Sequence, residues 1–75
     1  MIRYTAPWCA PCKAMQPVID RLRDEGYDII DVNVDDLSPA ELRRLGVLSV
    51  PTFKTDNGVL RGVQTYQKLL TFLNN

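Results

Sequence analysis

The spacing of hydrophobic residues along the first 35 positions predicts a strand, a helix and a second strand. Residues 2–5 have the length of a short buried strand, and a proline-containing loop follows at 6–11. Beyond it, apolar residues recur three or four positions apart, as on one face of a helix. They are Met15, Val18, Ile19 and Leu22, and Gly26 is a suitable residue to end that helix. Ile29 to Val34 is β-branched, which favours a strand covered on both faces.

The second half of the chain predicts a helix, a hairpin and a last helix. Ser38, Pro39 and Glu41 have the spacing of a capping box with proline at the first helical position, and Gly46 ends that helix. Two strands, at 50–55 and 59–61, then flank an Asn-Gly pair, which is a strong hairpin signal. The last helix is capped by Thr65, and its apolar face consists of Tyr66, Leu69, Leu70 and Leu73.

The element order is therefore βαβαββα, which predicts an α/β protein with a four-stranded mixed sheet flanked by three helices. With 75 residues, the chain is expected to form a single domain, 1–75. Nine basic and nine acidic residues balance to a net charge of zero, so neither a nucleic acid nor an anionic membrane is an expected partner. We see neither an apolar run of about 18 residues nor a signal peptide, and we expect a cytoplasmic monomer.

The candidate chemistry lies in the segment Trp8-Cys9-Ala10-Pro11-Cys12-Lys13. One thiol of such a pair can attack a disulfide while the other resolves the mixed intermediate. The first cysteine falls just before the predicted helix, whose N-terminus lowers the pKa of a thiol, so we assign Cys9 as the nucleophile and Cys12 as the resolving thiol. The alternative is a pair of inert or metal-binding cysteines, although the absence of histidine excludes Cys-His sites.

Together these motifs resemble the thioredoxin/glutaredoxin superfamily over nearly the whole chain. The resemblance rests on the segment 8–13, on Pro17, on Val50-Pro51-Thr52 and on Gly62. Length and element order resemble glutaredoxin, whereas the active site resembles thioredoxin, which usually has glycine at the position of Ala10. The resemblance implies a minimal thioredoxin fold, a redox-active disulfide between Cys9 and Cys12, and no bound cofactor or metal.

The resemblance also implies a set of substrate-binding residues around the thiols. A cis proline at Pro51 would lie against the cysteines, and Val50 would offer backbone hydrogen bonds to an extended substrate. An ordinary trans proline, a core position for Trp8 and a simple turn at Gly62 are the alternatives. The full predicted set is Trp8, Ala10, Pro11, Val50, Pro51 and Gly62.

Three charged residues are expected to modulate the thiols. Thioredoxin usually has an aspartate at the position of Arg3 and a lysine at that of Asp31, so the two charges are exchanged here. An arginine does not release its proton, so Arg3 would stabilise a thiolate while Asp31 titrates, and Asp31→Asn would slow resolution. The alternative is two solvated side chains on opposite sides of the sheet. Lys13 either adds positive potential near the thiols or belongs to a solvated helix face.

The predicted function is that of a disulfide oxidoreductase that reduces protein disulfides. By resemblance, its reductant would be an NADPH-dependent thioredoxin reductase and a candidate client would be ribonucleotide reductase. A glutathione-dependent glutaredoxin is the alternative enzyme, although the segment 61–65 has one glycine and no acid where glutaredoxins carry a Gly-Gly-x-Asp-like motif. An iron–sulfur carrier bridged through Cys9, or an interaction subunit, is the alternative from another class.

Overall fold

A four-stranded mixed sheet forms the centre of the molecule in the computed structural model, which describes all 75 residues. The strands are β1 (Ile2–Thr5), β2 (Ile30–Asn33), β3 (Thr52–Thr55) and β4 (Gly58–Arg61). Their order across the sheet is β2-β1-β3-β4, with β1 and β2 parallel and the other neighbours antiparallel. This is the sheet that the sequence predicts.

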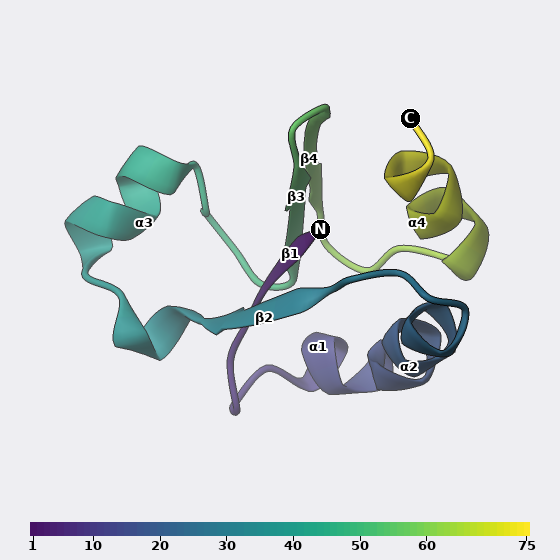
Figure 1. Ribbon diagram of the computed structural model, residues 1–75. Helices are drawn as coiled ribbons and strands as arrows, with labels where there is room; N and C mark the ends of the chain where they lie inside the picture. Colours follow the sequence, from purple (N-terminus) through teal and green to yellow (C-terminus); the bar gives the residue numbers. More distant parts are fainter.

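The helices cover both faces of this sheet, as Figure 1 shows. They are α1 (Ala10–Ala14), α2 (Gln16–Asp24), α3 (Pro39–Leu45) and α4 (Tyr66–Leu73), with a short 3₁₀ helix, η1 (Val34–Asp36), after β2. The helix α3 lies on one side, and α2 and α4 lie on the other. Because successive strand residues face opposite sides, two hydrophobic clusters form. One includes Tyr4, Cys9 and Cys12, and the other is built round Phe53 and Leu69.

The first predicted helix is two helices, so the chain has four α-helices where three were expected. The interruption is at Met15, whose N–H bonds to the carbonyls of Pro11 and Cys12 at 3.3 and 3.2 Å. Pro17 has no N–H to continue the ladder toward Lys13, and a proline ring also clashes with the preceding turn. Cys12 therefore lies in a helix of five residues, α1.

The expectation that the second strand is covered on both faces was wrong. Strand β2 lies at the edge of the sheet, and Ile30 is 62% exposed. Ile29, just before it, is buried. A run of β-branched residues fits any strand, whether central or at an edge, because the preference reflects the pleated surface rather than burial on both sides.

The predicted caps and the hairpin are present. The Ser38 hydroxyl accepts from the Glu41 N–H at 3.1 Å, and the Glu41 carboxylate accepts from the Ser38 N–H at 3.0 Å. Gly46 ends α3 in the left-handed conformation with φ 75°, and Thr65 caps α4. None of the four α-helices has the length and apolar character needed to cross a membrane.

Candidate active site

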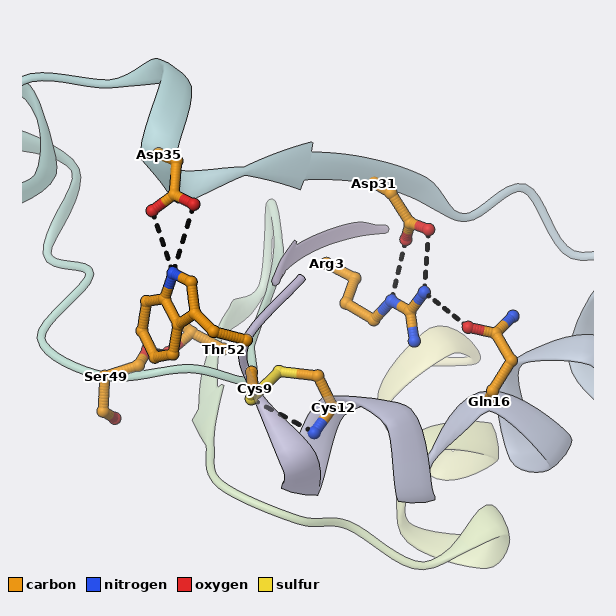
Figure 2. Close-up of a disulfide and its surroundings, with 9 residues drawn as sticks. Arg3, Cys9, Cys12, Gln16, Asp31, Asp35, Ser49 and Thr52 are labelled. Carbon is orange, nitrogen blue, oxygen red and sulfur yellow. Dashed lines mark hydrogen bonds and ion pairs between the residues drawn. A yellow bond between two sulfur atoms is a disulfide. The ribbon is translucent and has the colours of Figure 1, made fainter. Parts of the chain in front are cut away.

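The two cysteines form a disulfide at the carboxyl end of β1, where the chain turns into α1 (Figure 2). Their Cα atoms are 5.3 Å apart. Cys9 is the N-cap of α1, and its Sγ accepts a hydrogen bond from the Cys12 N–H at 3.2 Å. Both residues are almost completely buried, at 3% and 2% exposure. The predicted redox pair is therefore present.

The hydrogen bond to Cys9 distinguishes the two sulfurs, which burial does not. A helix of five residues has a small macrodipole, so the direct N–H contact is the larger effect. A thiolate accepts such a bond more strongly than a thiol or a disulfide sulfur, because charge-assisted hydrogen bonds are about twice as strong as neutral ones. Pro11 lies in the first turn, where its missing N–H costs nothing, and Ala10 and Pro11 are both exposed.

Trp8 precedes Cys9 in the chain and lies at the surface, 66% exposed, so the core position is excluded. Its Nε1–H donates to both carboxylate oxygens of Asp35, at 3.0 and 3.1 Å. Asp35 belongs to η1, and its own N–H is held by the Asn33 side chain at 2.9 Å. Asp35 was not among the residues predicted from the sequence. The signal was available, because parallel β1 and β2 end at the same edge of the sheet and Asp35 follows β2 directly.

The loop before β3 brings three predicted residues together. The Val50–Pro51 peptide bond is cis, as the family resemblance implies. The Gly62 N–H donates to the Pro51 carbonyl at 2.8 Å, which joins the start of β3 to the end of β4. Thr52 is 1% exposed and its hydroxyl donates to the Ser49 carbonyl at 2.6 Å. These bonds fix the loop 49–52 next to the disulfide.

An apolar groove of about 400 Å³ lies between this loop and α3. Trp8 and Val50 both line it, and Asp35 contributes its polar edge. Its other lining residues are Val34, Leu37, Pro39, Leu42, Val47, Leu48 and Ser49. Leu48 is 76% exposed at the rim, so a broad hydrophobic surface lies beside the thiols.

Arg3 and Asp31 form a bidentate ion pair rather than two solvated side chains. They are register partners across β1 and β2, and Arg3 Nε and Nη2 donate to the two Asp31 oxygens at 2.8 and 2.7 Å. The Arg3 side chain is 4% exposed and that of Asp31 is 37% exposed. Arg3 Nη2 also donates to Gln16 Oε1 at 3.1 Å, and Gln16 is a second residue that the sequence analysis missed.

The ion pair determines how Asp31 titrates. The hydrogen bond from the Arg3 guanidinium holds the pKa of Asp31 below its ordinary value of 3.8, with the positive charges of Arg3 and Arg23 acting in the same direction. A carboxylate with a lowered pKa is a weak proton acceptor, which argues against the titrating role expected for Asp31. Lys13 is exposed on α1 and lines a small opening of about 250 Å³ beside Cys12.

The chain is similar in sequence to thioredoxins. A thioredoxin family model matches residues 1–75. The thioredoxin of Chlamydia caviae is 36% identical over 81 aligned positions, which cover 99% of this chain and 78% of that protein. The thioredoxin of Haemophilus influenzae is 42% identical over 55 positions, 69% of this chain and 50% of that protein. The matched part of these relatives is thus between half and four fifths of their length.

Solved structures share the fold. A mutant thioredoxin from Halobacterium salinarum superimposes with a TM-score of 0.73 at 25% identity, covering 97% of this chain and 69% of that one. A chain from a structure on the thiol resolving mechanism in yeast mitochondrial 1-Cys peroxiredoxin via glutathione/thioredoxin systems also gives a TM-score of 0.73, at 30% identity over 97% of this chain and 74% of that one. No group of three or more His, Cys, Asp or Glu side chains is placed to hold a metal ion.

Proposed function

The chain belongs to the thioredoxin family, and on that premise we propose that it reduces protein disulfides, with Cys9 as the attacking thiol and Cys12 as the resolving thiol. The family and the Cys9–Cys12 pair make it a thioredoxin-like dithiol/disulfide oxidoreductase. The observation that carries the assignment of roles is the hydrogen bond from the Cys12 N–H to Cys9 Sγ, since it favours the thiolate at Cys9.

The reaction proceeds through one mixed disulfide. The Cys9 thiolate attacks a substrate disulfide, a bond forms between Cys9 Sγ and one substrate sulfur, and the other substrate sulfur leaves as a thiolate. The Cys12 thiolate then attacks Cys9 Sγ, which closes the intramolecular disulfide and expels the second substrate sulfur. The substrate sulfurs take up two protons from solvent. The cysteine pair loses two electrons, and the substrate gains them.

The surface beside the disulfide supports binding of an extended polypeptide. The backbone N–H and C=O of Val50 make no hydrogen bond within the chain, so they are available to a substrate strand. Trp8 and Leu48 offer exposed apolar contacts on the same side. A substrate segment that pairs with Val50 would lay one side chain into the groove of about 400 Å³.

The proposed reductant is a thioredoxin reductase, and ribonucleotide reductase is the proposed client to test first. The thioredoxin-like segment 8–13 supports the reductase, as do relatives named thioredoxin. The segment 61–65 has no acid, and the Gly62 N–H is already bonded to the Pro51 carbonyl. Both features make a glutathione carboxylate site less suitable here.

The assignment of the two thiols is tested by trapping. Cys12→Ser keeps the attacking thiol but cannot resolve the intermediate, so it should accumulate a covalent mixed disulfide and lose catalytic turnover. Cys9→Ser should accumulate no mixed disulfide. The readout is the mass of the protein after reaction with a disulfide-containing peptide. Trapping by Cys9→Ser instead of Cys12→Ser would overturn the assignment.

The reductant is tested by insulin reduction in two parallel assays. One contains NADPH and thioredoxin reductase, and the other contains NADPH, glutathione and glutathione reductase. Turnover in the first assay is the expected result. Turnover only in the second would make the protein a glutathione-dependent enzyme. The proposed client is tested separately, by direct reduction of oxidised ribonucleotide reductase.

A further inference from the structure

Arg3 Nη1 is the one buried side-chain nitrogen or oxygen with no hydrogen-bond partner. The other end of the same guanidinium is fully used, by Asp31 and Gln16. A guanidinium buried to this degree usually satisfies all of its N–H groups, because an unpaired buried donor is costly. Arg3 therefore carries a positive charge that is fixed in position, and its Nη1 group has no partner.

The charges around Arg3 do not cancel. Asp31 is shared by two guanidinium groups, since Arg23 Nη2 lies 3.3 Å from the same carboxylate. These ion pairs set two positive groups against one carboxylate. A second carboxylate, Asp20, accepts from Gln16 Nε2 at 2.8 Å rather than from a guanidinium, and it is exposed. Arg23 and Asp31 are both partly exposed, at 35% and 37%, so solvent screens them, whereas Arg3 is not screened. The residual field is strongest at the buried end of Arg3.

Gln16 connects the Arg3 guanidinium to the opening that Cys12 lines. Arg3 and Thr5 project from the same face of β1, because strand residues two apart share a face. Thr5, Cys12 and Gln16 together line the opening of about 250 Å³, and Gln16 contacts Arg3 directly. In Figure 2 the unbonded guanidinium nitrogen is the one on the side of the helix that carries Cys12.

We propose that Arg3 stabilises the thiolate of Cys12 in the reduced protein, so that the resolving thiol ionises without a buried carboxylate to take its proton. The inference rests on the proposed roles of the two cysteines. The S–H bond of Cys12 breaks, its electron pair stays on sulfur, and the proton passes to water in the opening that Cys12 lines. The thiolate then attacks Cys9 Sγ as described above.

The other charged groups on the elements around Cys12 are more exposed than Arg3. Lys13 on α1 and Asp20 on α2 are exposed. Arg23 on α2 is half-buried, and Asp31 on β2 is bound by both arginines. Tyr4 on β1 shares the hydrophobic cluster of Cys12. On β3, Lys54 donates to the Leu45 carbonyl near α3.

The test is a titration of Cys12 alone. In a Cys9→Ser background the only thiol is Cys12, and its ionisation is followed by the ultraviolet absorbance of the thiolate. Arg3→Met should raise the measured pKa of the thiol by about one unit or more, since an opposite charge nearby shifts a pKa by about one to three units. Arg3→Lys should stay nearer the unsubstituted background. The double variant Arg3→Met, Asp31→Asn removes the whole pair and should show the same rise.

Arg23→Met is the matched control, because it removes a guanidinium from the same carboxylate at a half-buried position. It should shift the titration by less than half as much as Arg3→Met. Equal shifts in the two variants, or no shift in either the single or the double Arg3 variant, would overturn the inference. The titration needs no substrate or reductase, so a failure of insulin reduction would refute the proposed function without touching this result.

Discussion

At the scale of single residues, the orientation of Trp8 depends on one carboxylate. An indole that is 66% exposed has little packing to hold it, and the two hydrogen bonds to Asp35 supply the constraint. Hydrogen bonds to a carboxylate are stronger than those between neutral groups. The indole therefore lines the groove in a fixed orientation, and a side chain that is already fixed loses little conformational entropy when a substrate binds.

Removing that carboxylate should weaken substrate binding. For Asp35→Ala we expect KM for a protein disulfide to rise severalfold, with a smaller change in kcat, because Trp8 loses its fixed position while the thiols are untouched. The measurement is steady-state insulin reduction. Asp36→Ala removes the neighbouring exposed carboxylate, which makes no bond to the indole, and should behave like the wild type. Equal effects of the two substitutions would point to general charge rather than to the position of Trp8.

Residue-level prediction from sequence succeeded where a local motif carried the chemistry. The spacing of Cys9 and Cys12 identified the thiols, and the loop position of Trp8 indicated its exposure. Asp35 and Gln16 were missed, because each contacts a residue 27 or 13 positions away, and only the register of strands and helices brings them there. The pairing of Arg3 with Asp31 is likewise fixed by the parallel register of β1 and β2.

At the scale of elements, α3 depends on its cap. This helix has seven residues and none of them is fully buried, so packing contributes little and the capping box at Ser38 contributes much. Ser38→Ala should lower the free energy of unfolding by about 1 kcal/mol, the usual cost of losing a serine N-cap. Ser38→Asp keeps an N-cap acceptor and should stay close to the wild type. Denaturant unfolding measures both, and equal losses would show that the hydroxyl is not a cap in solution.

The loop that carries Val50 depends on Thr52. Its buried hydroxyl donates to the Ser49 carbonyl at 2.6 Å, so Thr52→Val keeps the shape and leaves that carbonyl unpaired. We expect a loss of about 1–3 kcal/mol in unfolding free energy. We also expect a higher KM in insulin reduction, because Val50 is then less firmly placed. Thr71→Val on the exposed surface of α4 is the control. A stable Thr52→Val variant with unchanged KM would contradict the role given to this bond.

Element prediction was reliable where both the pattern and the end signals were local. The Ser38 cap, the Gly46 stop and the hairpin at Gly58 are local signals, and they are present as predicted. Periodicity alone could not show that Pro17 divides the first helix, since apolar residues keep the same face on both sides of the break. Nor could composition distinguish an edge strand from a central one at β2.

At the scale of the whole molecule, 75 residues give a thin core. Fifteen residues are buried, and twelve of them form two clusters of six on opposite faces of one sheet. A domain of this size buries only about 60% of the surface of its unfolded chain. Individual polar contacts therefore contribute a larger share of its stability than they would in a bigger protein. Because some of these contacts involve titratable groups, the free energy of unfolding should depend measurably on pH.

The direction of that pH dependence follows from three groups. Hydrogen bonds hold the pKa values of Asp31 and Glu41 below 3.8 and 4.5, through Arg3 and through the Ser38 backbone respectively. A folded-state pKa that is depressed adds stability above the unfolded value, and this stability is lost as the pH falls through the folded value. The hydrogen bond to Glu25 raises the pKa of Tyr66 above 10.0, so its contribution is present below 10.0 and is lost as the pH rises.

We therefore expect a plateau of stability between pH 4.5 and 10.0, with a fall on each side. Urea unfolding midpoints measured across this range provide the test. Asp31→Asn should be less stable than the wild type on the plateau, because the buried Arg3 loses its charged partner. The difference in unfolding free energy should narrow below pH 3.8, as the Asp31 carboxylate of the wild type is protonated. Tyr66→Phe should flatten the alkaline fall and leave the acid fall unchanged. A constant difference between Asp31→Asn and the wild type at every pH would show that the carboxylate contributes through packing rather than through its charge.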